Sequence, residues 1–368
     1  MGEKLKKIYK VIGLPRLIIF ALFVIILIGA KFYNLDMAAQ FSNVLRRYGM
    51  YGVLVLAMVP AIQCGIGPNF GISLGIVCGL LGSLLAIEYN IAALPMFAGN
   101  PELGSWMSLL FALVVAAATA WLVGTGYGLL LNRVKGSEMT VSTYVGFSAI
   151  AFMNIWWVTL PFQSGEINWP IGGEGARNTI SLASSFSDRL SKTWGFYLIG
   201  DETSGLYIPT GMLLFFFLMC LAVWLFLRSK TGKAMSAAGS NPVFARASGI
   251  NVDKMRVTGT AISTSLAAVG IIVYAQAFGF LQMYNAPQMM GFACVAAVLI
   301  GGASTARAKI SNVLIGTFLF QGLLVVAPPV MNNVFKGTDI SDIMRIIISN
   351  GIIIYALTKA KGGAANAE

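Results

Sequence analysis

The chain lacks the residues and motifs on which most enzyme active sites depend. It contains no histidine, the commonest general base and a frequent metal ligand. It also contains no G-x-S-x-G nucleophile elbow, no H-E-x-x-H zinc motif and no G-x-x-x-x-G-K-[ST] nucleotide loop, because Gly232-Lys233 is followed by Ala234. Its four cysteines lie within apolar runs without the spacing of a metal site, so they are expected to be buried and unreactive. The sequence therefore predicts a non-catalytic protein that binds no metal or cofactor of its own.

Charged residues are also scarce, and their spacing is the most informative feature of the chain. Only 11% of the residues are charged, whereas 57% are hydrophobic. There are 40 uncharged residues between Arg47 and Glu88, and 50 between Arg256 and Arg307. A helix that crosses the roughly 30 Å hydrocarbon core of a bilayer needs about 20 apolar residues. Each of these two gaps can therefore hold two membrane crossings.

Six shorter gaps can each hold one crossing: 17–30, 103–132, 139–165, 203–227, 310–335 and 346–358. Period-two alternation is absent from these runs, which argues against an outer-membrane barrel. We therefore predict an all-α polytopic membrane protein with about ten transmembrane helices, in which residues 1–368 form a single domain. The basic start of the chain precedes an apolar run without a clean cleavage site, so it is interpreted as a retained first crossing rather than a signal peptide.

Lysine and arginine residues predict the orientation, because they are retained on the cytoplasmic side of short loops. With ten crossings and both termini cytoplasmic, 17 of the 25 basic residues lie inside. The polar insertion 161–207 is then extracytoplasmic, and the basic loop 228–256 is cytoplasmic. Arg46 and Arg47 are exceptions on the outer side, in a stretch from Asp36 to Tyr48 that is a candidate interfacial helix. Retention signals and anionic headgroups explain the net charge of +11, so no nucleic-acid partner is expected.

The cytoplasmic loop contains a short segment with capping signals at both ends. Asn241 suits a helix N-cap, Pro242 suits the first helical position, and Gly249 suits a left-handed stop. These signals predict a helix of about two turns over 242–248, with Phe244 available as a knob. Such a helix fits insertion into a groove on a partner protein. A surface helix that merely joins two crossings is the alternative.

The run from Gly239 to Val252, G-S-N-P-V-F-A-R-A-S-G-I-N-V, resembles the G-x-N-x-x-A-A-R-x-x-G-I-N-V loop of ABC-importer permeases of the ribose, galactoside and branched-chain amino-acid superfamily. The segment 300–304, I-G-G-A-S, is similar to the G-G-x-S that follows the eighth crossing in that family. The resemblance implies a permease subunit whose loop helix docks on an ATPase. The residues matched to this coupling role are Ser240, Asn241, Pro242, Val243, Phe244, Ala245, Arg246 and Gly249.

The resemblance also implies a set of partners. Two permeases, either identical or closely related, work with two ATPase domains that bind ATP and Mg, while a soluble binding protein delivers the solute. The chain itself then binds no cofactor, and its location is the cytoplasmic (inner) membrane of a bacterium. Charges on the 161–207 loop are candidates for steering the binding protein.

Departures from the family pattern leave the solute class open. After Ser304 the chain continues T-A-R-A-K instead of further glycines. Gly71 stands where sugar permeases carry the aspartate of G-I-D-L-S-V-G, and Asn69-Phe70 is similar to a signature of the amino-acid and nucleoside branches. A simple sugar is the first candidate, a nucleoside the second and a branched-chain amino acid the third.

Residues 65–71 interrupt the first long gap with three glycines and a proline. They form either a cytosolic turn between two crossings or a broken helix that lines a pathway. The resemblance favours a pathway role for Asn69 and Ser73. Other polar side chains within apolar runs serve either as contacts between helices or as hydrogen-bonding groups for a hydroxylated solute. The candidate translocation residues are Gln63, Asn69, Phe70, Ser73, Asn154 and Gln276.

Two other classes of function stay as alternatives. An ATP-independent carrier or channel usually has ionisable residues in mid-membrane, and the nearest candidate, Glu88, lies at a predicted helix end. An integral membrane enzyme needs an ionisable cluster deep in the bilayer, which the sequence does not contain. The aromatic group Phe152, Trp156 and Trp157 is interpreted as an interfacial belt rather than a sugar-stacking surface.

Overall fold

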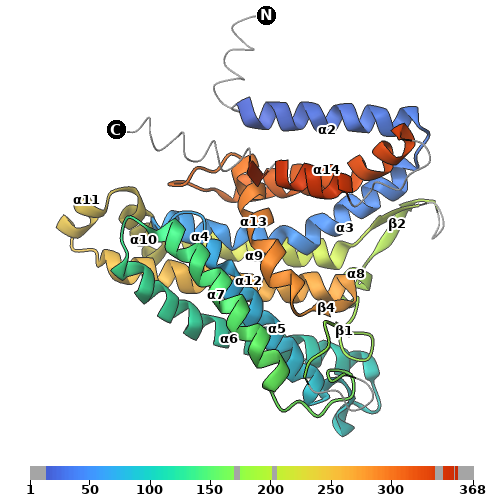
Figure 1. Cartoon of the computed structure of the whole chain (residues 1–368), viewed down its shortest axis with the longest axis horizontal. Coiled ribbons are helices and arrows are strands. Elements are labelled where there is room, and N and C mark those ends of the chain that lie inside the picture. The colour runs from blue at the N-terminus through green and yellow to red at the C-terminus, as the bar shows by residue number, and fades with distance from the viewer. Residues whose placement is uncertain (1–13, 170–174, 201–204, 336–342, 352, 355–368) are drawn as a thin grey trace, which may run out of the picture.

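Long helices dominate the structure (Figure 1). The computed structural model describes residues 14–169, 175–200, 205–335, 343–351 and 353–354. Seven helices in these ranges are long and apolar enough to cross a membrane: Met37–Gln63, Phe70–Ala93, Pro101–Arg133, Glu138–Thr159, Thr210–Arg228, Val252–Phe278 and Ile310–Val334. Two shorter apolar helices are Leu17–Phe32 and Asn285–Ile300. The chain is thus a polytopic helical membrane protein.

The main helices follow the order expected from the charge-free gaps. They are α2 (Leu14–Phe32), α3 (Met37–Leu56), α4 (Met58–Gln63), α5 (Ser73–Glu88), α6 (Pro101–Arg133), α7 (Glu138–Thr159), α9 (Thr210–Arg228), α12 (Val252–Phe278), α13 (Asn285–Ile300) and α14 (Ile310–Val334). The first long gap contains two helices long enough to cross a membrane, as predicted, whereas the second contains one such helix, α12, and the shorter apolar helix α13. The last predicted crossing, 346–358, lies mostly outside the described residues, although 343–351 are helical. The total of ten and the side on which the termini lie stay predictions.

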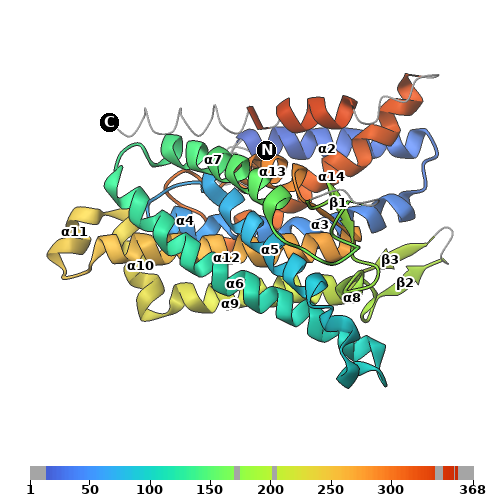
Figure 2. The ribbon, with the colours of Figure 1, turned by 60° about the horizontal axis from the view of Figure 1, so that its bottom comes forward.

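The helix α12 runs through the centre of the bundle and packs on α3, α5 and α6 (Figure 2). Over an apolar stretch of 18 residues in each helix, 78% of the α12 residues are buried, compared with 22% of the α7 residues. The peripheral helices α6, α7 and α9 keep apolar side chains exposed, as expected for surfaces that face lipid. The bundle therefore has central and peripheral helices, and the central helix α12 contacts most of the other elements.

Small residues let α13 and α14 approach each other at the backbone. A Cβ atom on Gly316 would lie 1.9 Å from the carbonyl oxygen of Ala297, and a Cβ atom on Gly301 would lie 1.8 Å from the carbonyl oxygen of Asn312. The Asn312 side chain donates a hydrogen bond to the Gly301 carbonyl at 2.7 Å. This contact is typical of helix packing in lipid, where close backbone approach replaces the hydrophobic driving force.

The stretch from Asp36 to Tyr48 is not a separate interfacial helix, contrary to the prediction. The Asp36 side chain accepts hydrogen bonds from the backbone N–H groups of Ala38 and Ala39 at 2.9 and 3.1 Å, and thereby caps α3. The helix then continues without interruption to Leu56. The two arginines of this stretch consequently lie on a crossing helix.

The described residues of the segment 161–207, namely 161–169, 175–200 and 205–207, depart from the all-α prediction, because they form a small cap with short strands. β1 (Thr179–Ser181) pairs antiparallel with β4 (Phe280–Gln282), and β2 (Phe196–Ile199) pairs antiparallel with β3 (Leu206–Ile208). Apolar side chains of this cap are fully buried, namely Ile167, Ile180, Leu182 and Phe186. The alternation of Ile180 and Leu182 with polar neighbours explains a strand here, and the segment is a folded cap rather than a solvated loop.

Two polar residues of the crossings hold the cap in place. The Glu88 carboxylate, at the end of α5, accepts hydrogen bonds from the backbone N–H groups of Gln163 and Ser164 at 2.8 and 3.1 Å. The Gln276 side chain of α12 is fully buried and accepts a hydrogen bond from the backbone N–H of Leu190 at 3.1 Å. Leu190 belongs to α8 (Arg189–Lys192), the short helix of the cap. Both side chains therefore have a structural role at this end of the bundle.

Candidate functional site

The predicted loop helix is present as α11 (Pro242–Ala247), which follows α10 (Lys230–Ser240). The Asn241 side chain accepts a hydrogen bond from the backbone N–H of Phe244 at 3.0 Å, which is the expected N-cap. Gly249 has a φ of +78°, a left-handed conformation that favours glycine. The capping signals thus predict this helix correctly, with its end one residue earlier than expected.

α11 presents an apolar knob to its surroundings. Val243 is 78% exposed and Phe244 is 67% exposed, whereas Ala245 is buried against Ala238 and Val252. Figure 1 shows α11 at the edge of the molecule, next to α10 and at one end of the bundle of long helices. Two adjacent exposed apolar side chains on a capped helix form a compact surface that suits a groove on another protein.

An ion pair connects α11 to the start of α12, which is itself paired with residues at the ends of α6 and α7. Arg246 of α11 lies 4.0 Å from Asp253 at the start of α12, and Lys135 after α6 lies 2.6 Å from the same carboxylate. Arg256 of α12 and Glu138 of α7 form a second pair at 2.5 Å. The side chains of this second pair are only 9% and 14% exposed, so it is buried. Through α12, α11 is therefore in ion-pair contact with the ends of α6 and α7.

A second contact joins α10 to the chain between α4 and α5. A Cβ atom on Gly239 would lie 2.2 Å from the carbonyl oxygen of Gln63 and 2.7 Å from the backbone nitrogen of Gly65. The Gln63 side chain accepts a hydrogen bond from the Ser236 hydroxyl at 3.0 Å and donates one to the Ala308 carbonyl at 2.5 Å. Gln63 therefore lies beside α10 and bridges it to the segment between α13 and α14.

Replacing Gly239 by alanine is expected to destabilise the protein by about 1–3 kcal/mol, because the added methyl group overlaps backbone atoms and overpacks the contact. Gly126→Ala is the matched control, since a Cβ atom there meets nothing within 4 Å on an exposed face of α6. Thermal unfolding of the purified protein in detergent measures both variants. The midpoint should fall for Gly239→Ala and stay unchanged or rise for Gly126→Ala. If the two variants unfolded at the same midpoint temperature, the close contact between Gly239 and the backbone of residues 63–65 would be contradicted.

The segment that precedes α5 is a discontinuous element inside the protein rather than an exposed turn. Residues 64–69 lack helical structure between α4 and the 3-10 turn η1 (Phe70–Ile72), and 66–69 are buried. The Asn69 amide donates a hydrogen bond to the Ser263 hydroxyl of α12 at 2.9 Å. It also accepts one from the Tyr127 hydroxyl of α6 at 3.2 Å. Asn69 thus joins this segment to the centre of the bundle.

Phe70 and Ser73 line a narrow space between α5, α7 and α13. The Ser73 hydroxyl donates a hydrogen bond to the Pro287 carbonyl at 2.7 Å, and the rings of Phe70 and Phe292 lie 5.7 Å apart between centroids. The space has a volume of only about 10 Å³, which is about the minimum that holds one water molecule. The space, called the constriction below, is thus too small to hold a solute in this structure.

The structure does not bring Asn154 or Gln276 to this constriction. The Gln276 side chain is instead hydrogen-bonded to Leu190 of the cap, and Asn154 is half-buried on α7. Beside Asn154, Phe152 and Trp156 are exposed, which agrees with the predicted aromatic belt, whereas Trp157 is fully buried in the core. The assignment of Asn154 and Gln276 to a translocation path stays a prediction.

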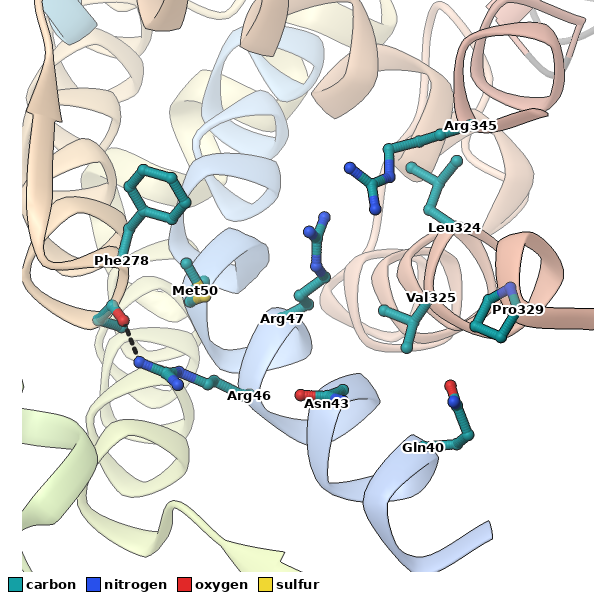
Figure 3. Close-up of a pocket in the computed structure, with 11 residues that line it drawn as sticks. Gln40, Asn43, Arg46, Arg47, Met50, Phe278, Leu324, Val325, Pro329 and Arg345 are labelled. Atoms are coloured by element: carbon teal, nitrogen blue, oxygen red, sulfur yellow. Dashed lines mark hydrogen bonds between the residues drawn. The ribbon is translucent and has the colours of Figure 1, made fainter. Parts of the chain in front are cut away.

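Two adjoining cavities of about 380 and 360 Å³ lie between α3, the end of α12, α13 and α14, and Figure 3 shows the residues that line the first of them. They share Arg47, Leu324 and Arg345. Their polar lining residues are Gln40, Asn43, Arg46, Arg47, Tyr51, Tyr274, Gln282, Asn285, Gln288, Gln321, Arg345, Ser349 and Asn350. From the sequence, Arg46 and Arg47 are only exceptions to the orientation rule. The feature of the sequence that could have indicated these cavities is the pair of adjacent arginines next to a long uncharged run, because charges close to a crossing are costly.

Known proteins similar to the chain are transport subunits. Residues 40–355 match the family described as branched-chain amino acid transport system / permease component. The xylose transport system permease protein XylH of Escherichia coli K12 is 25% identical, with 87% of this chain and 84% of XylH covered. The nucleoside ABC transporter permease protein NupC of Lactococcus lactis is 25% identical, with 74% and 81% covered. The ribose import permease protein RbsC of Haemophilus influenzae is 22% identical, with 92% and 90% covered. No solved structure matches the chain.

The family match confirms the resemblance seen in the loop 239–252. It extends over all the long helices from α3 to α14, and so includes α11, the constriction and the cavities. Several named relatives are permease proteins for sugars, and one is a permease protein for nucleosides. The chain therefore belongs to the family of branched-chain amino acid transport system permease components, the membrane subunits of ABC transporters.

Proposed function

We propose that the chain is the permease subunit of an ATP-driven importer that carries a small polar solute, in the first place a simple sugar, across the cytoplasmic (inner) membrane of a bacterium. A second permease, identical or closely related, completes the translocation path. A separate ATPase subunit binds ATP and Mg, and an extracytoplasmic binding protein delivers the solute. Ten crossings, with both termini in the cytoplasm, place α11 on the side of the ATPase.

The exposed knob of α11 is the observation that carries this proposal. In the proposed mechanism, ATP binding closes the ATPase pair and moves α11. The ion pairs of Asp253 and Arg256 transmit the movement to α6, α7 and α12. The contact of Gly239 with Gly65 passes it to the segment that ends at Asn69. The constriction then widens, and the cavities on the opposite side close around the solute path.

The lining of the cavities supports a hydroxylated solute. Side-chain amides both donate and accept hydrogen bonds, as sugar hydroxyl groups require, and five of them line the cavity that contains Tyr51 and Tyr274. The names of XylH and RbsC refer to xylose and ribose, and the name of NupC refers to nucleosides. A nucleoside is therefore the second candidate, and a branched-chain amino acid the third.

Purification of the tagged chain from its native membrane tests the proposal. An ATPase subunit should co-purify, and vesicles reconstituted with this complex and its binding protein should accumulate solute only when ATP reaches the ATPase side. Accumulation by the chain in vesicles that lack an ATPase would contradict the proposal and indicate a self-contained carrier.

A further inference from the structure

The strands β2 and β3 of the cap, called the β2–β3 pair below, expose large apolar side chains. Figures 1 and 2 show the pair at the end of the bundle opposite α11. All four residues of β2 are exposed. Leu198 and Ile199 are 58% and 64% exposed, and Trp194, two residues before the strand, is 70% exposed. An exposed apolar patch of this kind marks a surface that contacts another molecule or the membrane.

The β2–β3 pair is held firmly on the bundle, so the exposure does not come from a loosely attached segment. The backbone N–H of Tyr207 in β3 donates a hydrogen bond to the Ser42 hydroxyl of α3 at 2.7 Å. The Tyr207 hydroxyl donates one to the Ser191 carbonyl of α8, also at 2.7 Å. The rings of Tyr197 and Tyr207 lie 5.0 Å apart between centroids. The fold therefore presents the apolar side chains of β2 in a fixed position.

Trp194 has a backbone conformation that is unusual for its residue type. Its φ is +54°, a left-handed value that glycine adopts readily and bulky residues avoid. The exposed ring gains little from packing within the chain. A bulky residue that is kept in a disfavoured conformation without such packing indicates a role for its side chain in a contact outside the chain.

The helix α9 shows how deep in the membrane the β2–β3 pair lies. α9 has 19 residues and is therefore about 28 Å long, close to the roughly 30 Å of the hydrocarbon core. Its last residue, Arg228, lies over the ring of Trp224, as expected where a crossing reaches the interface. Its first residue, Thr210, then lies at the opposite interface, and β3 ends only two residues earlier. The β2–β3 pair consequently starts at the level of the lipid headgroups.

The arrangement of β2 favours lipid over a protein partner. Side chains alternate between the two faces of a strand, and all four side chains of β2 are exposed, so both faces are open. A protein surface would cover one face, whereas lipid surrounds a strand. No charged residue stands between Lys192 and Asp201. The chain also continues from β3 into α9, whose exposed Leu214 and Leu218 face lipid.

The free edge of β2 limits how far the strand can enter the bilayer. In the described part of the chain, β2 is hydrogen-bonded only to β3, so its other edge has open backbone groups. Such groups are costly in the hydrocarbon core, where no water can bond to them. They are satisfied among the headgroups, where water is present. The layer that suits both the apolar side chains and the open edge is therefore the boundary between headgroups and acyl chains.

We infer that the β2–β3 pair is a lipid-binding anchor, whose exposed apolar side chains insert into this boundary on the membrane face opposite α11. Tryptophan and tyrosine side chains favour the same layer. β2 follows α8, and α8 is bonded to the central helix α12 through Leu190 and Gln276. The anchor thereby fixes the depth of the cap on the bundle. The inference goes beyond the proposed function, because it depends on neither the solute nor the ATPase.

The test places a fluorescent label on β2 in the full-length chain, reconstituted in phosphatidylcholine vesicles. The four native cysteines are buried, so Leu198→Cys provides one exposed thiol for the environment-sensitive dye NBD. Two quenchers are compared: a phosphatidylcholine with a nitroxide near the headgroup end of its acyl chain, and iodide on both sides of the vesicle. The label at position 198 should be quenched by the lipid nitroxide and protected from iodide.

Ala183→Cys is the matched control, because Ala183 is an exposed residue of the same cap between the exposed polar residues Ser181 and Ser184. A label there should be quenched by iodide. Iodide quenching at position 198 equal to that at 183 would overturn the inference, since β2 would then stand in water, open to a soluble protein. Protection at position 198 from both quenchers would also overturn it, since a second protein copy would then cover the strand.

Trp194→Gly, added to Leu198→Cys, tests the part played by the ring. Glycine suits the φ of +54°, so the thermal midpoint in detergent should be unchanged or higher. Quenching by the lipid nitroxide should fall, because the largest exposed ring of the anchor is lost. A lower midpoint with unchanged quenching would assign the ring to packing within the chain and contradict its role as an anchor.

Discussion

Replacing Phe244 by aspartate is expected to abolish ATP-driven uptake while the amount of folded protein stays the same. The side chain is 67% exposed, so little packing within the chain is lost when it is replaced. In the proposed assembly, however, the ring fills an apolar groove on the ATPase, and a carboxylate there would be buried without a partner. Burying an unpaired charge costs several kcal/mol, which is on the order of the free energy by which a short helix binds its groove.

ATP-dependent uptake, ATPase co-purification and the thermal midpoint of the purified chain together measure this effect. Thr231→Asp is the matched control, because it adds the same charge at an exposed position of α10, in the same loop but off α11. We expect Phe244→Asp to lose uptake and the ATPase while Thr231→Asp keeps both. Normal uptake by Phe244→Asp would show that α11 only joins two crossings, which is the alternative that capping alone leaves open.

Replacing Arg256 by methionine is expected to destabilise the protein by about 3–5 kcal/mol, because it leaves the Glu138 carboxylate buried without its partner. The guanidinium group also donates a hydrogen bond to the Asn132 side chain at 2.9 Å, so a second contact between α12 and α6 is lost. Replacing both charged residues, as in Arg256→Met with Glu138→Leu, removes the uncompensated charge and should recover most of the stability.

Thermal midpoints of the single and double variants in detergent test this ion pair. Lys135→Ala supplies the comparison, since Lys135 and Asp253 are 40% and 54% exposed and such a pair contributes about 0–1 kcal/mol. The expected order is a large fall for Arg256→Met, partial recovery for the double variant and little change for Lys135→Ala. A double variant as unstable as Arg256→Met would mean that the buried charge is not the cause.

Features that depend on neighbouring residues could be predicted from the sequence. The helix α11 is defined by an N-cap, a proline and a left-handed glycine within nine residues of one another, so its existence and ends follow from local chemistry. The long helices follow from uncharged runs, because a single charge in the hydrocarbon core is expensive. The two crossings in the first long gap are predictable for the same reason.

Features that depend on distant residues could not be predicted in this way. Asn69 finds its partner Ser263 at a sequence separation of 194 residues, and nothing near Asn69 indicates that its amide joins two elements. Gln276 is equally uninformative in sequence, although its side chain holds the cap through Leu190. The cap itself was expected to be solvated because of its charges, whereas its buried side chains pack on the ends of the crossings.

The cavities illustrate the same limit most clearly. Arg47 and Arg345 are nearly 300 positions apart, and in the sequence one is an exception to the orientation rule while the other only marks the end of a gap. The fold brings them to the same two cavities, whose walls include residues of α3, of α14 and of the helical residues 343–351. The charge pattern along a chain predicts its topology. Which distant arginines line the same cavity depends on how the helices pack, and the charge pattern does not predict that packing.

Labelling of a cysteine at position 244 tests the central claim most directly. The four native cysteines are all buried, so Phe244→Cys provides a single exposed thiol for a membrane-impermeant maleimide. The account predicts labelling in inside-out vesicles stripped of the ATPase, no labelling in right-side-out vesicles, and protection when the ATPase is added back. Labelling from the outside, or labelling that the ATPase does not prevent, would contradict it.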